Sequence, residues 1–248
     1  MYQGQKVSAI IPALNEQLAI AKVVAQLINL KDSNGLRIID EVVVCDNAST
    51  DDTAKIATLY GARVVRQDIP GYGIACLTAI NALVPCEIVL FIDGDDSCFV
   101  EQAIPLLDGI VNGDDLAIGS RALGNIEKGA LTQVQIFGNA LSAVLIRILW
   151  GHKITDLGPF RAIKRSVLKR LNMQDQTFGW TVEMQIKAIQ LGFKINEYPV
   201  NSKVRIGQSK ISGTINGSIK AGIGILSMII KLRYLQRKLL ARFALENS

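Results

Sequence analysis

Short apolar runs alternate with amphipathic segments along the first half of the chain. The runs are three to five residues long and rich in β-branched side chains, which is typical of strands covered on both faces. They lie at residues 7–11, 41–45, 63–65, 88–92 and 116–118. Segments with helical spacing follow at residues 18–30, from 53, from about 73 to 83, and at 100–110. The alternation predicts a doubly wound α/β fold of the nucleotide-binding type, with helices on both faces of a central sheet.

The apolar run at 88–92 ends abruptly in three acidic residues, Asp93, Asp95 and Asp96. Acidic side chains at the carboxyl end of a central strand point into the crevice where open α/β sheets bind ligands. Three carboxylates so close together repel one another unless a cation compensates. Mg²⁺ and Mn²⁺ bind carboxylate oxygens together with substrate phosphates. The stretch therefore predicts a metal–phosphate site, with a solvated acidic turn as the alternative.

Two other strand ends carry polar residues. Proline stops a β-ladder, so the first strand is expected to end before Pro12, with Asn15 as a turn or helix-cap residue. Asp46 follows its own strand as Asp93 follows another, and both carboxylates are therefore predicted to face one crevice. Helix capping is the alternative reading of the polar residues after Asp46.

Glycines open the helix that follows the third strand, at Gly71 and Gly73. Glycine at a helix start lets a ligand approach free backbone amides, so this position is predicted to favour phosphate. Glycine pairs are also common in ordinary loops.

The second half of the chain has a different character. A long, mostly apolar helical segment spans residues 132–150, and a loop at 156–161 combines the carboxylate of Asp156 with a guanidinium. Glu183 lies in the first turn of a further helix, where it complements the helix dipole or meets a sugar. The loop at 205–210 carries two cations and a hydroxyl, and such a loop can close over a diphosphate leaving group.

Charge is distributed unevenly along the 248 residues. Nine basic residues and one acidic residue lie after residue 200, so that part carries +8 and the rest −3 of a net charge of +5. We expect a catalytic domain at residues 1–214 and a basic amphipathic helical segment at 215–248. A basic tail indicates an anionic partner, namely phosphate, a membrane surface or nucleic acid.

The tail at 215–243 combines Ile, Leu and Met with Lys and Arg, as does a helix lying in a membrane interface. The alternative is that it packs on the catalytic domain or on a partner subunit, so homo-oligomerisation stays open. Nucleic acid is not expected, because only Tyr234 and Phe243 are available for base stacking after residue 214.

The remaining sequence features bear on location. The amino terminus leads directly into the first strand, so no signal peptide is expected, and no apolar run of about 18 residues is expected to span a bilayer. The four cysteines show no metal-ligand spacing, which favours reduced thiols. We therefore expect a cytoplasmic protein that contacts the inner face of a membrane peripherally.

Several motifs in one order resemble the family-2 glycosyltransferases of the type-A fold, most closely the dolichyl- and polyprenyl-phosphate mannosyl- and glucosyltransferases. The motifs are IIPALNE (10–16), VVVCDNASTDDT (42–53), FIDGDD (91–96), GSR (119–121), DLGPFRAI (156–163), WTVEM (180–184) and RIGQSKISGT (205–214). The resemblance covers residues 7 to about 214 and implies a Rossmann-like fold with a mixed central sheet.

The resemblance also implies roles for particular residues. Nucleotide-binding positions are Pro12, Asn15, Glu16 and Asp46. Asp93 and Asp95 match a DxD motif, which in relatives holds Mg²⁺ or Mn²⁺ against the diphosphate of a nucleotide sugar. Ser97 stands where polyprenyl-phosphate relatives have a glutamine that helps with the metal.

Further roles follow on the acceptor side. Arg121 matches a contact to the acceptor phosphate, whereas Arg205, Ser209 and Lys210 match the loop that closes over the diphosphate. The relatives carry another basic residue after the GSR motif, and here Gln133 and Gln135 occupy that neighbourhood.

These parts predict an inverting hexosyltransferase that uses UDP-glucose or GDP-mannose and a polyprenyl or dolichyl phosphate acceptor. The metal ion and the cationic loop at 205–210 would stabilise the departing diphosphate, and Asp95 would be essential for turnover. A lipid phosphate needs no strong base, whereas a hydroxyl acceptor would need Asp156 or Glu183 to take its proton. The alternatives are transfer to a hydroxyl, a nucleotidyltransferase that releases pyrophosphate, and a binding scaffold without turnover.

Overall fold

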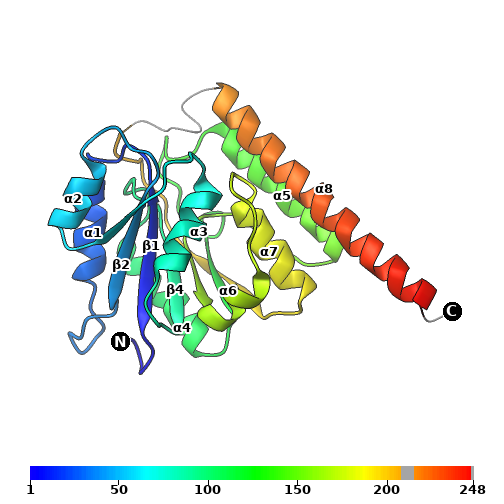
Figure 1. The fold of residues 1–248 in the computed structure, drawn as a ribbon, viewed down its shortest axis with the longest axis horizontal. Coiled ribbons are helices and arrows are strands. Elements are labelled where there is room, and N and C mark those ends of the chain that lie inside the picture. The colour runs from blue at the N-terminus through cyan, green and yellow to red at the C-terminus, as the bar shows by residue number, and fades with distance from the viewer. Residues whose placement is uncertain (208–214, 247–248) are drawn as a thin grey trace.

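A seven-stranded mixed sheet forms the centre of the computed structural model, which describes residues 1–207 and 215–246 (Figure 1). The strand order is β3-β2-β1-β4-β6-β5-β7. The strands are β1 (Val7–Ala13), β2 (Glu41–Asp46), β3 (Arg63–Arg66), β4 (Ile88–Phe91), β5 (Leu116–Ser120), β6 (Arg161–Lys164) and β7 (Ile195–Pro199). Only β6 pairs antiparallel, with β4 on one side and β5 on the other. The predicted Rossmann-like mixed sheet is confirmed.

Helices cover both faces of this sheet, because successive strand side chains point to opposite sides. On β4, Ile88 and Leu90 face one core and Val89 and Phe91 face the other. The first core is closed by α1 (Ile20–Ile28), α2 (Thr53–Leu59) and α4 (Ala103–Val111). The second core is closed by α3 (Tyr72–Ala82), α6 (Arg165–Leu171) and α7 (Trp180–Gln190). A single 3₁₀ turn, Val100–Gln102, precedes α4.

The first strand is longer than predicted, since β1 continues through Pro12 to Ala13. Pro12 pairs in register with Cys45 of β2, whereas pairing with β4 ends at Ile10. Beyond Ile10 the strand therefore has a neighbour on one side only, and a residue that lacks a backbone donor is tolerated there. The extension carries Pro12 to the carboxyl edge of the sheet.

Two long helices, α5 (Gln133–Trp150) and α8 (Ile215–Glu246), lie side by side and extend away from the sheet (Figure 1). They share a third apolar cluster with α7, in which Ile146, Val182 and Ile229 are buried. The indole nitrogen of Trp150 donates to Gln236 at 2.8 Å and joins the two helices further along. Residues 225–236 of the tail thus form a helical stretch that packs on the body along one face.

The expectation that no segment could span a bilayer is wrong by length and composition, because α5 is long and apolar enough. Gln, Asn and Ser interrupt the apolar runs of this segment. Averaged over all 18 residues, however, the mean hydropathy of 1.3 is high enough. Length and composition alone do not place the helix in a membrane. Only 11% of the segment is buried in the protein, so α5 is not an ordinary core helix.

Candidate active site

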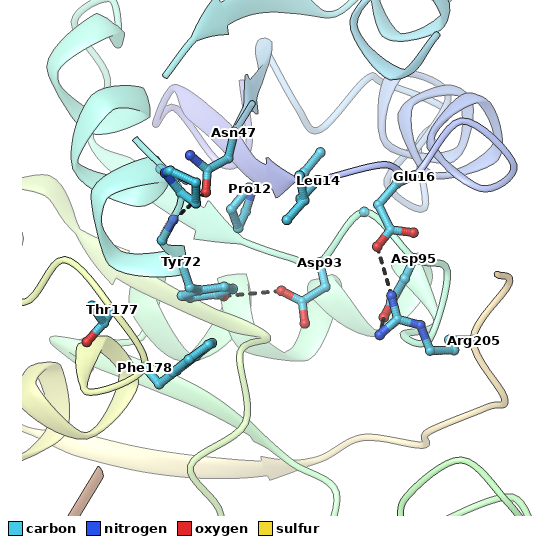
Figure 2. A pocket seen from close by; sticks show the side chains of 15 residues that line it. Pro12, Leu14, Glu16, Asn47, Tyr72, Asp93, Asp95, Thr177, Phe178 and Arg205 are labelled. Atoms are coloured by element: carbon cyan, nitrogen blue, oxygen red, sulfur yellow. Dashed lines mark hydrogen bonds and ion pairs between the residues drawn. The ribbon is translucent and has the colours of Figure 1, made fainter. Parts of the chain in front are cut away.

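Two cavities meet at the carboxyl edge of the sheet, where β1 and β4 end. The first has a volume of about 290 Å³ and lies between the β1–α1 loop, the start of α3 and the 177–178 loop (Figure 2). The second, of about 160 Å³, lies between the end of β5, the start of α5 and residues 200–202. Both cavities are lined by Asp93, Asp95 and Arg205. The acidic pair and one cation therefore form the wall between the two spaces.

Asp93 lies at the centre of this wall. The hydroxyl of Tyr72 donates to its Oδ1 at 3.1 Å (Figure 2). Burial, and then the negative charge of Asp95, raise the pKa of Asp93 to about 7. Repulsion between two carboxylates this close is the electrostatic feature expected of a cation site.

Asp96, unlike Asp93 and Asp95, lines neither cavity. Its backbone is left-handed, with φ at 59°, and its side chain is buried. The carboxylate pairs with Lys22 at 2.7 Å and with Lys203 at 2.8 Å. The predicted cluster of three repelling carboxylates is therefore wrong, because only Asp93 and Asp95 face the cavities.

The carboxylate pair still suits a divalent ion. Within residues 1–207 and 215–246, no group of three or more acidic, His or Cys side chains could hold a metal by itself. Mg²⁺ is commonly held by one or two carboxylates plus substrate phosphates, and Asp93 and Asp95 fit that pattern. Ser97 lines the second cavity, and its backbone nitrogen donates to Asp95 at 3.0 Å.

Arg205 bridges two segments of the site (Figure 2). Its guanidinium contacts Glu16 at 2.8 Å and Asp95 at 3.2 Å. Its Nε is buried and lacks a hydrogen-bond partner in the part of the chain that the structure describes. A cation with a spare donor beside the acidic pair can neutralise a diphosphate. Ser209 and Lys210, predicted in the same loop, lie outside the described residues.

Of the predicted nucleotide-binding residues, Pro12, Glu16 and Gly71 line the first cavity. Asn15 does not, because its side-chain oxygen accepts from the backbone of Thr50 at 2.8 Å and joins two loops. Its backbone is also left-handed, with φ at 53°.

Asp46 is buried away from the cavity, contrary to the prediction that it faces the crevice with Asp93. Its carboxylate pairs with Arg66 and accepts from the backbone of Ser49. The next residue, Asn47, lines the cavity in its place. Its amide donates to the carbonyl of Ile69 at 2.7 Å and so supports the loop before α3.

The prediction of free amides at the start of α3 is also wrong. The amide of Gly73 donates to Thr177 at 3.1 Å, that of Ile74 to Gln176 at 3.0 Å, and that of Gly71 to the side chain of Asn47 at 2.7 Å. The glycine at 73 serves close packing, because a Cβ there would lie 2.1 Å from the carbonyl oxygen of Asp175. This contact brings the 177–178 loop into the first cavity.

Thr177 and Phe178, which line that cavity, were not found from the sequence. No motif marks them, and their place depends on the packing of a distant loop against α3. The glycine pair was the available signal, since paired glycines also mark close backbone approach.

Asp156 and Glu183, the candidate bases, line neither cavity. Asp156 is buried and accepts from Arg121 through the backbone nitrogen, Nε and Nη2, all within 2.8 Å. Glu183 accepts from the backbone of Asp175 at 2.8 Å and pairs with Lys187 at 2.7 Å. Both carboxylates hold loops in place, and the geometry does not support a base role for either.

Arg121 lines the second cavity, with 22% of its side chain exposed. Burial opposes its charge, but the hydrogen bonds to Asp156 outweigh burial and raise its pKa. Arg121 therefore presents a fixed positive charge to this space. The family resemblance predicted that Arg121 contacts the acceptor phosphate, and its place in the second cavity is compatible with that role.

The guanidinium predicted in the loop at 156–161 belongs to Arg161, which is the first residue of a strand instead. Arg161 on β6 is almost fully buried, and its guanidinium donates to the carbonyls of Leu157, Gly158 and Thr181. Burial lowers its pKa to about 10. Arg161 thereby fixes the loop that carries Asp156, a role that the sequence did not indicate.

Fold and site together define an α/β protein with paired carboxylates at the carboxyl edge of a mixed sheet, beside two cavities. Residues 8–171 match the family model described as "Glycosyl transferase family 2". The chain belongs to this family, and it is a family-2 glycosyltransferase enzyme.

Two relatives cover nearly the whole chain. An uncharacterized glycosyltransferase of Mycobacterium tuberculosis is 31% identical over 220 residues, covering 88% of this chain and 95% of the relative. The dolichyl-phosphate hexose transferase of Haloferax volcanii is 31% identical over 221 residues, covering 88% and 91%.

Among solved structures, glucosyl-3-phosphoglycerate synthase from Mycobacterium tuberculosis shares the fold with a TM-score of 0.69. It is 24% identical, with 91% of this chain and 80% of that chain covered. That structure is a complex with Mn²⁺, uridine diphosphate and glucosyl-3-phosphoglycerate. At this identity the likeness carries the fold alone.

Proposed function

We propose that the protein transfers a hexose from UDP-glucose or GDP-mannose to a polyprenyl or dolichyl phosphate, with inversion at the anomeric carbon. The observation that carries the proposal is the shared wall of Asp93, Asp95 and Arg205 between the two cavities. A nucleotide sugar in the first cavity and an acceptor in the second would meet at this wall. The alternatives were transfer to a hydroxyl, nucleotidyl transfer and a scaffold without turnover.

The donor belongs in the first, larger cavity. Its volume of about 290 Å³ lies near the lower end of the usual range for ligand pockets, roughly 300–1,000 Å³. Pro12 and Phe178 give it apolar walls, whereas Glu16 and Arg205 supply polar groups at the acidic end. A base and ribose would lie between the apolar walls, and the diphosphate would lie beside Arg205.

Asp93 and Asp95 would hold a divalent cation, since one or two carboxylates together with substrate phosphates are its usual ligands. When bound there, Mg²⁺ or Mn²⁺ would supply positive charge that stabilises the diphosphate leaving group. Arg205 contributes a second positive charge on the same side, and Lys210 is proposed to join it from the neighbouring segment.

A phosphate acceptor suits the second cavity better than a hydroxyl. Arg121 and Arg205 supply positive charge there, and Asp93 and Asp95 are the carboxylates among the described residues that line it. A hydroxyl would need a free base, whereas Asp156 and Glu183 are tied up elsewhere. A phosphate is already anionic and needs none.

The bond changes then balance without a proton acceptor. An oxygen of the acceptor phosphate attacks the anomeric carbon from the face opposite the leaving group. The bond between that carbon and the diphosphate oxygen breaks, and the electron pair leaves with the nucleoside diphosphate. Arg121 holds the attacking phosphate and Arg205 stabilises the charge that develops on the diphosphate.

The lipid nature of the acceptor is supported by the dolichyl-phosphate hexose transferase at 31% identity. Glucosyl-3-phosphoglycerate synthase favours a second candidate, a small phosphorylated acid, because the fold is shared and a 100-residue stretch is 37% identical. Both acceptors present a phosphate to the same cavity. They differ in the apolar surface that they need.

A labelled-sugar assay tests the proposal. The purified protein is incubated with UDP-glucose or GDP-mannose, Mn²⁺, and either a polyprenyl phosphate or 3-phosphoglycerate. We expect label in the organic phase, release of UDP or GDP, and loss of both with EDTA. If label appears only on 3-phosphoglycerate, the acceptor is a small phosphorylated acid and the lipid acceptor is refuted. Pyrophosphate released from a nucleoside triphosphate, with no sugar transfer, would indicate a nucleotidyltransferase.

We further propose a catalytic domain at residues 1–214, followed by a helical segment at 215–248 that serves peripheral attachment to the cytoplasmic face of a membrane. The four cysteines are free and buried, which suits a reducing compartment. Self-association is a second role for the helical segment, and sedimentation velocity of the whole protein tests it.

A further inference from the structure

Asp96 lies in the turn after β4, where it lines neither cavity and is only 3% exposed. Its carboxylate pairs with Lys22 of α1 at 2.7 Å and with Lys203 at 2.8 Å. Its backbone is left-handed, with φ at 59°. A buried charge in an uncommon backbone conformation persists only where the surrounding structure compensates its cost. The two lysines supply this compensation, and one of them lies in the segment that carries Arg205.

The segment that carries Arg205 is hydrogen-bonded to the turn after β4. The backbone nitrogen of Lys203 donates to the carbonyl of Ser97 at 3.0 Å. That of Ile206 donates to the carbonyl of Asp95 at 2.9 Å. Arg205 lies between these two bonds, so the turn fixes the place of its backbone. Lys203 holds the segment twice, once through its backbone and once through its side chain.

The contacts of the Arg205 side chain depend on what the site holds. Its guanidinium contacts Glu16 and Asp95, and both of these carboxylates line the first cavity (Figure 2). A cation bound to Asp95 would compete with the guanidinium, and a diphosphate would attract it. Asp96 lines neither cavity, so its pair with Lys203 persists whatever the cavities contain.

We propose that Asp96 is a positioning residue, which holds Arg205 at the wall between the two cavities through its ion pair with Lys203. A cation that is already in place stabilises the departing diphosphate without rearrangement while the bond breaks. Misplacement by about 1 Å can cost about 100-fold in rate. This inference rests on the proposed role of Arg205 in leaving-group stabilisation, and it gives Asp96 a role other than that of a metal ligand.

Three variants isolate the ion pair. Asp96→Asn removes the charge and keeps the side-chain size, and asparagine tolerates the left-handed backbone. Lys203→Met breaks the same pair from the other side and keeps the side-chain length. Lys22→Met is the matched control, because it removes the other ion pair of the same carboxylate, from a lysine that is 52% exposed. Circular dichroism and denaturant unfolding verify that each variant is folded.

Hydrogen exchange followed by NMR measures the anchor without turnover, in the whole protein without added metal or nucleotide. The amides of Lys203 and Ile206 donate to carbonyls of the turn, so both should be protected in the wild type. We expect them to exchange about tenfold faster or more in Asp96→Asn and Lys203→Met, and at the wild-type rate in Lys22→Met. Unchanged exchange in Asp96→Asn, or an equal effect of Lys22→Met, would refute the anchor.

Steady-state transfer tests whether the anchor serves catalysis, with UDP-glucose or GDP-mannose, Mn²⁺ and a short-chain prenyl phosphate. Asp96→Asn should lower kcat about tenfold, with a smaller change in KM for the nucleotide sugar, because positive charge is needed most as the diphosphate leaves. Lys22→Met should retain the wild-type kcat. Electron paramagnetic resonance should show nearly unchanged Mn²⁺ affinity in Asp96→Asn. A loss of Mn²⁺ affinity as large as the loss of kcat would make Asp96 a support of the metal ligands and contradict the proposal.

A double-mutant cycle with Arg205→Ala separates positioning from a general structural role. If Asp96 acts through Arg205, Asp96→Asn should lower kcat no further in the Arg205→Ala background. A further tenfold loss there would show that Asp96 supports another group, against the proposal.

The same measurements separate this proposal from the proposed function. Faster exchange in Asp96→Asn beside a wild-type kcat in Arg205→Ala would refute the proposed role of Arg205 and leave the anchor standing. A slow Arg205→Ala beside unchanged exchange and unchanged kcat in Asp96→Asn would refute the positioning role alone.

Discussion

The hydroxyl of Tyr72 donates to Oδ1 of Asp93 at 3.1 Å and comes from the first residue of α3. One oxygen of Asp93 is thereby occupied, and the other remains available to a cation. A hydrogen bond of this kind orients a metal ligand, and its loss commonly costs about 10–100-fold in metal affinity.

We expect Tyr72→Phe to weaken Mn²⁺ binding about tenfold in the presence of UDP, since the ring that walls the first cavity is kept and only the hydroxyl is lost. Electron paramagnetic resonance of free Mn²⁺ measures the affinity directly. Tyr60→Phe, at an exposed tyrosine, is the matched control. An unchanged affinity would show that Tyr72 does not position Asp93.

The raised pKa of Asp93 makes the stability of the metal-free protein depend on pH. The folded group titrates at about 7, whereas the unfolded carboxyl titrates at 3.8. Between these values the folded state binds more protons, so stability falls as pH rises from about 4 to 7. Urea denaturation in EDTA across this range measures the effect. Asp93→Asn should remove this part of the pH dependence, and a persisting slope would assign it to other groups.

Arg205 and a metal ion compete for Asp95, which lies 3.2 Å from the guanidinium. In Arg205→Ala we therefore expect opposite changes in two measurements. Mn²⁺ binding without nucleotide should strengthen several-fold, because a competing cation is gone, whereas turnover should fall about 100-fold through loss of leaving-group stabilisation. Calorimetry and the transfer assay measure them. A parallel loss of both would indicate misfolding or a purely structural role.

Asp156 and Arg121 form a buried pair held by three hydrogen bonds. Breaking such a pair from one side costs about 3–5 kcal/mol, and we expect the lower end for Asp156→Asn because Arg121 is partly exposed. Denaturant unfolding gives the value. A wild-type stability combined with a lost acidic limb in the pH–rate profile would instead restore Asp156 as a base.

The glycine at 73 permits the close contact between α3 and the 175–177 loop. Gly73→Ala should destabilise the protein by about 2 kcal/mol or more and weaken UDP binding, because the methyl group would collide with a backbone carbonyl. Gly138→Ala on α5 is the control, since no atom lies within 4 Å of the added carbon. It should be neutral or stabilising by up to about 1 kcal/mol. Thermal shift with and without UDP reports both effects.

Much of the fold followed from local pattern. The apolar run at 88–92 could be placed at mid-sheet because a strand covered on both faces has no polar alternation, and its end put Asp93 and Asp95 at the crevice. Both inferences used only chain direction and periodicity. They needed no knowledge of distant partners.

The wrong predictions concern charged side chains whose partners could not be read from the local sequence. Asp96 left the acidic cluster because Lys203, 107 residues later, pairs with it, and Asp46 turned toward Arg66. Arg161 is buried because carbonyls from the loop before it and from the first turn of α7 accept its hydrogen bonds. Spacing along a sequence carries no information on such pairings, so the carboxylates could be located but their partners could not.

The wall of Asp93, Asp95 and Arg205 faces both cavities, so a ligand bound in one cavity changes the charge that a ligand in the other cavity meets. Diphosphate that lingers after transfer would keep Arg205 engaged and alter the charge seen by the next incoming anion. The order of product release would then limit turnover, rather than the glycosyl transfer step itself.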